Sequence, residues 1–96
     1  MKLSEGTENE TPAHAALMLY KARALRQLGL PTAARDTLTT ALRRKKDRPD
    51  ELLMALRYER ALAYEDLDQR LRSRSELEKL YAEDPDYEDV ATRLGL

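Results

Sequence analysis

The side chains that could carry out catalysis are few and isolated in this 96-residue chain. His14 is its one histidine, there is no cysteine, and no serine lies in an elbow motif. Nucleophilic catalysis and metal binding both need several such groups that converge on one point. We therefore interpret His14 as a surface residue, and we expect no catalytic residue, no metal ligand and no cofactor.

Carboxylates are plentiful, but their placement favours roles at helix ends. The two densest groups are Glu65-Asp66-Asp68 and Glu83-Asp84-Asp86. Acid–base chemistry needs paired carboxylates in a dry pocket, whereas acids at helix ends act as caps and solvated groups. The three glycines are scattered and form no phosphate-binding loop. The sequence therefore indicates a protein that is not an enzyme.

The sharpest charged feature is the segment from Arg43 to Arg48, in which five of six residues are cationic. Such a cluster can bind phosphates, but no aromatic residue lies nearby for base stacking, and the second half of the chain is acidic. We expect Arg43 to Lys46 to form the last turn of a helix, where cations offset the negative helix end. Weak nucleic-acid binding through Arg43–Arg48 stays open as an alternative.

Charge is distributed unevenly along the chain. Residues 20–48 carry a net charge of +7 and residues 49–96 a net charge of −6, although the whole chain carries only −1. Complementary surfaces of this kind can pair between copies. Self-assembly into a homodimer or larger oligomer is therefore a second alternative.

An internal repeat indicates which elements position these side chains. Residues 39 positions apart are identical at five places: Ala22 and Ala61, Ala24 and Ala63, Leu28 and Leu67, Arg35 and Arg74, and Leu38 and Leu77. A period between about 20 and 50 residues is typical of stacked helical hairpins. No stretch of alternating β-branched residues predicts a strand. We expect an all-α fold of two stacked antiparallel helical hairpins with a short C-terminal capping helix.

Helix start and stop signals divide the chain into elements. The expected helices run from Pro12 to Gly29, over 31–46, over 49–67 and over 70–83, followed by a short helix after Asp86 that buries Val90 and Leu94. Asp47 is a candidate cap for the third helix. The first helix has two apolar stripes: Ala13, Ala16, Leu17, Tyr20, Ala24 and Leu28 on one, and Leu19, Ala22 and Leu25 on the other. Leu71 is expected to point inward from the fourth helix.

The organisation that follows is one small domain. Residues 1–11 are polar and without apolar period, which predicts a disordered lead-in, and residues 12–96 form a single helical domain. No secretory signal, and no apolar window of about 20 residues, is present. We expect a soluble, cytoplasmic protein without membrane contact, and the chain could be a piece of a longer one.

The second unit resembles a tetratricopeptide repeat. Its matching residues are Ala61, Tyr64, Asp68, Ser73, Leu77 and Asp84-Pro85, and those of the first unit are Ala22, Leu25, Gly29, Ala34, Leu38 and Ala41. The resemblance covers about residues 13–87 and implies a concave groove, lined by the first helix of each unit, that receives a peptide or helix. With only two units, it also implies capping by residues 88–96 or a dimer.

Carried over by spacing, the resemblance places nine residues in that groove: Leu19, Tyr20, Arg23, Arg26, Gln27, Tyr58, Leu62, Glu65 and Asp66. Tyr20, Tyr58 and Leu62 would be apolar anchors. Arg23 and Arg26 are one turn apart and could hold a carboxylate of the partner. The sequence thus predicts a small, non-enzymatic protein–protein interaction module.

Overall fold

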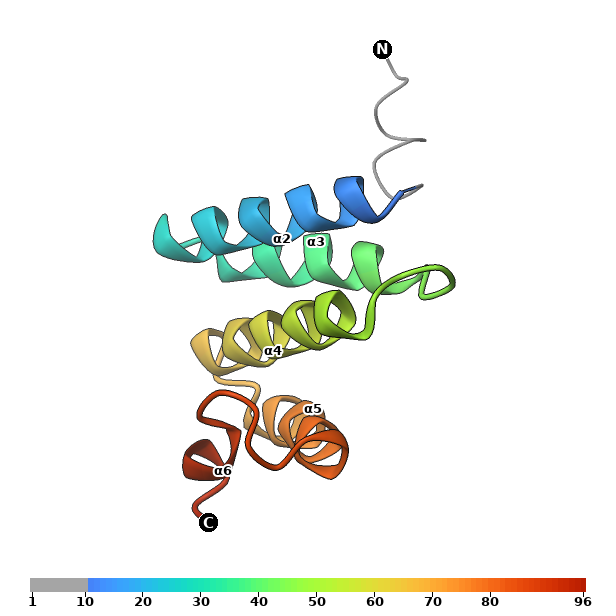
Figure 1. Ribbon diagram of the computed structural model, residues 1–96. Coiled ribbons are helices and arrows are strands. Elements are labelled where there is room, and N and C mark those ends of the chain that lie inside the picture. Colours follow the sequence, from blue (N-terminus) through green and yellow to red (C-terminus); the bar gives the residue numbers. More distant parts are fainter. Residues whose placement is uncertain (1–10) are drawn as a thin grey trace.

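The computed structural model describes residues 11–96 and confirms the all-α prediction (Figure 1). The described helices are α2 (Pro12–Gln27), α3 (Pro31–Leu42), α4 (Asp50–Asp66), α5 (Arg70–Glu83) and α6 (Val90–Arg93), and residues 11–96 contain no strand. The predicted lead-in lies, except for Thr11, outside the described residues.

The turns that join the helices within each hairpin follow from residues that accept a left-handed backbone. Gly29 has a φ of 80° after α2, and Asp68 has a φ of 60° at the equivalent place after α4. Glycine adopts this conformation without steric cost, and aspartate tolerates it better than most residues. Both hairpins are therefore tight, and their helices are antiparallel.

The connection between the hairpins differs from the prediction. Helix α3 ends at Leu42, so Arg43 to Lys46 follow the helix and do not form its last turn. Thr37, Thr39 and Thr40 have low helix propensity, and four successive cations in one turn would repel one another. Asp47, expected to cap the third helix, has a φ of 61°, and α4 begins after Pro49 without a side-chain cap.

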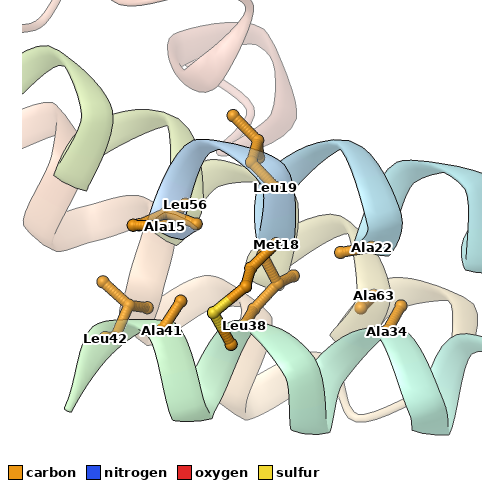
Figure 2. Packing of buried hydrophobic residues seen from close by; sticks show 10 residues of the cluster. All are labelled: Ala15, Met18, Leu19, Ala22, Ala34, Leu38, Ala41, Leu42, Leu56 and Ala63. Carbon is orange, nitrogen blue, oxygen red and sulfur yellow. The ribbon is translucent and has the colours of Figure 1, made fainter. Parts of the chain in front are cut away.

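Two apolar clusters hold the hairpins together. The first joins α2, α3 and α4, and Figure 2 shows Met18, Leu38 and Ala34 between α2 and α3, with Leu56 and Ala63 contributed by α4. The second joins α4, α5 and α6 around Leu77, Leu80 and Val90. Because α4 belongs to both clusters, the two hairpins and the short C-terminal helix form one continuous stack.

Residues 87–96 cap the stack at the α5 end. Val90 is fully buried and Leu94 is 7% exposed, as the spacing of one turn predicts. The capping helix is shorter than expected. It begins only at Val90, directly after Asp89, and ends at Arg93. Its role in covering the second cluster is confirmed.

Several residues expected in the core are on the surface instead. Leu71 is 86% exposed, so the prediction that it points inward is wrong. On α2, the stripe of Ala15, Met18, Leu19 and Ala22 is buried, whereas Leu17, Tyr20 and Leu28 are 64%, 62% and 73% exposed. Only one of the two faces of α2 has a neighbour among the described residues.

Candidate functional site

The nine predicted site residues belong to α2 and α4, the first helices of the two hairpins. These helices lie on the same side of the stack and contact each other directly. The structure places some of the nine residues in a network that joins α2 to α4, one in the first apolar cluster, and others under the C-terminal segment, while the rest stay accessible.

A buried carboxylate joins α2 to α4. Glu59 is 4% exposed, and its two oxygens accept hydrogen bonds from Arg23 Nε at 3.3 Å and Arg26 Nη1 at 2.7 Å. Asp66 Oδ2 accepts a further bond from Arg26 Nε at 2.8 Å. Burial would lower the pKa of Arg26, but the bonds to Asp66 and Glu59 outweigh it and raise that pKa above its usual value.

This network changes the role predicted for Arg26. Its guanidinium binds two carboxylates of the same chain, so it is not available to hold a carboxylate of a partner. These ion pairs also neutralise part of the positive charge of residues 20–48 with part of the negative charge of residues 49–96. Basic α2 and acidic α4 therefore pair within the molecule. The sequence analysis does not identify Glu59, although a signal was present. Its spacing places it on the apolar stripe of Leu52, Leu56 and Ala63, and a buried carboxylate needs a charged partner.

Leu19 is a second correction. It is 7% exposed and belongs to the first apolar cluster, where Figure 2 shows it on the side of α2 away from α3. A side chain that is already buried within the chain cannot also anchor a partner. Tyr20, the next residue, is 62% exposed.

The C-terminal segment covers Tyr58. The Tyr58 hydroxyl donates a hydrogen bond to Asp89 Oδ1, and its ring packs edge-on against that of Tyr87, with 5.8 Å between centroids. Burial and the bond to Asp89 raise the pKa of Tyr58, while the bond from Tyr58 lowers the pKa of Asp89. Tyr58 therefore fastens the chain's own tail to α4.

Glu65 is engaged in the same way. Arg93 Nη1 donates to Glu65 Oε1 at 2.6 Å, and Arg93 Nε donates to both oxygens of Asp89 at 3.0 Å. The α4 end of the predicted groove is thus covered by residues 87–93. Tyr58 and Glu65 therefore contact the chain's own C-terminal segment.

The residues that stay accessible form what we call the α2–α4 surface: Tyr20, Arg23, Gln27, Leu62 and Asp66. The Arg23 guanidinium carbon lies 5.8 Å from the centre of the Tyr20 ring, a cation–π contact. Gln27 of α2 is exposed, and Leu62 of α4 is half-buried. This surface combines an aromatic side chain, an aliphatic one and both signs of charge.

The other chemistry-bearing residues do not gather into a site. No group of three or more His, Cys, Asp or Glu side chains within residues 11–96 is placed to hold a metal ion. Arg48 is buried, which separates it from the exposed run of Arg43 to Lys46. Among the described helices, none is long and apolar enough to cross a membrane.

A depression of about 380 Å³ lies between α4, α5 and α6. Three arginines line it, but each is paired within the chain: Arg70 with Asp68, Arg74 with Glu78, and Arg93 with Glu65. An anion would therefore compete with existing carboxylate partners, so the depression does not favour anion binding.

No protein-family model matches this sequence, and neither a curated protein nor a solved structure matches it significantly.

Proposed function

We propose that this protein is a non-enzymatic protein–protein interaction module that binds a peptide or helix of a partner along the α2–α4 surface. The observation that carries the proposal is Tyr20, a large aromatic side chain that is 62% exposed and stacked against Arg23. Tyrosine and arginine are enriched among the residues that dominate binding energy at interfaces.

The surface is held in place before any partner arrives. Glu59 fixes the Nε of Arg23 and also binds Arg26, which in turn binds Asp66. Side chains that are already ordered lose less conformational entropy on binding. The network therefore supports the proposal indirectly, by holding Arg23 beside Tyr20 and by fixing α2 against α4.

The chemistry of the surface indicates the kind of segment that it would bind. The bond to Glu59 uses Nε of Arg23, and this side chain remains 46% exposed, which leaves its terminal Nη groups accessible to a carboxylate. Tyr20 on α2 and Leu62 on α4 offer apolar contacts. A partner segment with an apolar residue next to an acidic one fits this arrangement.

Membership of the tetratricopeptide repeat family, and a cytoplasmic location, remain parts of this proposal. The repeat of 39 residues and the two left-handed turns at Gly29 and Asp68 are what support the first. The absence of cysteine from the sequence supports the second.

Affinity capture with quantitative mass spectrometry tests the proposal. We expect partners retained by the unmodified chain to be lost with Tyr20→Ala and with Arg23→Glu, while Leu71→Ala, which removes an exposed leucine of α5, leaves capture unchanged. Tyr58→Ala and Arg26→Glu are poor probes, because both break contacts within the chain. Capture that is unaffected by Tyr20→Ala and Arg23→Glu alike would contradict the proposal.

A further inference from the structure

One apolar face of α2 is uncovered within residues 11–96. It consists of Ala13, Leu17, Ala24 and Leu28, and we call it the α2 outer face. All four residues are exposed, Leu17 by 64% and Leu28 by 73%. They lie on the side of α2 opposite Ala15, Met18 and Ala22, which are buried in the first cluster. The face is distinct from the α2–α4 surface, although Tyr20 borders both.

The internal repeat shows what covers the equivalent face of α4. Adding 39 to the four positions gives Leu52, Leu56, Ala63 and Leu67. Leu56 and Ala63 are fully buried in the cluster that contains Leu38 and Ala41 of α3. In Figure 1, α3 lies between α2 and α4. A face of this kind is therefore covered, elsewhere in the same molecule, by a helix.

Helix α3 also indicates which residues such a helix carries. It buries Ala34, Leu38, Ala41 and Leu42, an alanine–leucine stripe at positions i, i+4, i+7 and i+8. On the α2 outer face, Ala13 and Ala24 leave room for a second helix to approach closely, at the interaxial distance of about 8–10 Å usual for packed helices. An amphipathic helix with small and branched aliphatic residues on one side fits this face.

The charges on and near α2 indicate which kind of helix would bind to the α2 outer face. Helix α2 carries Lys21, Arg23 and Arg26 and no acidic residue. Both Arg23 and Arg26 are paired with Glu59, but Lys21 is exposed. The exposed run of Arg43 to Lys46 belongs to the connection between α3 and α4, which lies on the side of the molecule where α2 begins (Figure 1). A helix with carboxylates beside its apolar stripe is complementary to these cations.

A second copy of the chain fits less well. Pairing the outer face of α2 with itself would bring the exposed Lys21 of one copy near that of the other, with no carboxylate on either α2. Head-to-tail stacking would need α5, the equivalent of α3, but its Leu77 and Leu80 are already packed against Val90 and Leu94. Neither arrangement offers the complementarity that an acidic helix does.

We propose that the α2 outer face docks an acidic amphipathic helix of another protein, in the position that α3 occupies against α4. The face adds a second interaction surface to the one described above, and it uses different residues. Binding here does not require Arg23 or Leu62.

The test is a titration of the ¹⁵N-labelled full chain with a capped synthetic helical peptide. The peptide carries alanine and leucine at the spacing found in α3, with glutamate at the positions flanking that stripe, and its helicity is checked by circular dichroism. A matched peptide carries lysine in place of glutamate. We expect the glutamate peptide to shift amide signals of Leu17, Ala24 and Leu28, and the lysine peptide to bind at least about tenfold more weakly.

Variants of the chain separate the apolar contribution from the electrostatic one. Leu17→Lys should weaken binding of the glutamate peptide by about tenfold or more, while Leu71→Lys, a matched change at an exposed leucine of α5, should leave it unchanged. Lys21→Glu should weaken the glutamate peptide and strengthen the lysine peptide. If the two peptides bind this variant with equal affinity, Lys21 is the source of the preference for the glutamate peptide.

Four outcomes would overturn the proposal. The first is no shift on α2 at about 1 mM glutamate peptide, where a site of useful affinity is largely filled. The second is a set of shifts confined to Arg23, Gln27 and Leu62, which would assign the peptide to the α2–α4 surface. The third is a concentration-dependent shift of Leu17 without peptide, which would assign the face to a second copy. The last is nuclear Overhauser contacts between Leu17 and residues 1–10 of the same chain.

Discussion

Leu17 and Leu56 are the same amino acid at equivalent positions of the two hairpins, and their surroundings are opposite. Leu56 is fully buried, whereas Leu17 is 64% exposed. The cause is the neighbouring element, because α3 packs against α4 while no element within residues 11–96 packs against the outer face of α2. Apolar side chains allow a helix face to pack against another helix. Whether the face is buried depends on whether its helix has a neighbour on that side of the stack.

The interiors of the two hairpins differ as well. Ala15 and Met18 of α2 face α3 in an apolar cluster, but the position equivalent to Met18 is Arg57, which pairs with Glu83 of α5 at 2.5 Å. Arg60 pairs with the buried Glu76 at 2.9 Å. The second hairpin therefore depends more on ion pairs between its helices, and the first more on close apolar packing.

The largest expected difference between the hairpins is in the cost of shortening the equivalent leucines. Leu56→Ala should lower the free energy of unfolding by about 2–5 kcal/mol, because it leaves a cavity between α3 and α4. Leu17→Ala should change it by less than about 0.5 kcal/mol, because the side chain is mostly in solvent. Urea denaturation followed by circular dichroism measures both. Equal losses would mean that the two faces are equally covered.

Removing the buried carboxylate between α2 and α4 should have the next largest effect. Glu59→Ala should lower the free energy of unfolding by about 1–3 kcal/mol, since Arg26 would lose one of its two partners while remaining largely buried. Glu78, which pairs with Arg74 at the surface, is the matched control, and Glu78→Ala should cost at most about 0.5 kcal/mol. If Glu59→Ala lowers the free energy of unfolding no more than Glu78→Ala does, the network does not stabilise the fold.

Substitutions at the two left-handed turns should change stability in opposite directions. Gly29→Ala should cost about 1 kcal/mol, because alanine is strained at a φ of 80°. Asp68→Gly should gain a few tenths of a kcal/mol, because glycine relieves the strain of a non-glycine residue at a φ of 60°. Thermal unfolding of both variants checks the signs. A stabilising Gly29→Ala would show that this turn does not hold the left-handed conformation.

The contact of the C-terminal segment with α4 should depend on pH, with a smaller effect. The bond from Tyr58 lowers the pKa of Asp89 below its ordinary value of 3.8, so this contact stabilises the fold fully above that value and is lost as the pH falls through the lowered pKa. Tyr58→Phe removes the bond and should flatten the fall in stability between about pH 5 and pH 2. Identical acid profiles for the variant and the unmodified chain would contradict this role for Asp89.

Much of the fold could be predicted from the sequence, because its signals are local. Gly29, Pro31 and Asp84-Pro85 mark helix ends directly, and the 39-residue repeat relates one hairpin to the other. The end of α3 was predicted wrongly, because cations following a helix resemble cations within its last turn. The sequence predicts Leu71 inside, yet it lies on the side of α5 opposite the buried Ser73, Leu77 and Leu80 and is 86% exposed.

The candidate site was predicted less well, because its contacts join residues far apart in sequence. A helix with two apolar stripes does not reveal which stripe meets a neighbour, so the sequence predicts Leu19 in the groove although it is buried. The partners of Arg26 and Tyr58 lie 33 and 31 residues away, at Glu59 and Asp89. Only the packing of α4 against α2 and of the tail against α4 brings these pairs together.

Equivalent leucines are open on α2 and covered on α4, and methyl NMR measures this difference in solution. A soluble gadolinium chelate added to the methyl-labelled full chain broadens the signals of methyl groups that water reaches. We expect strong broadening of the Leu17 and Leu28 signals and protection of those of Leu56 and Leu38. Protection of Leu17 equal to that of Leu56 in a dilute sample would contradict this expectation.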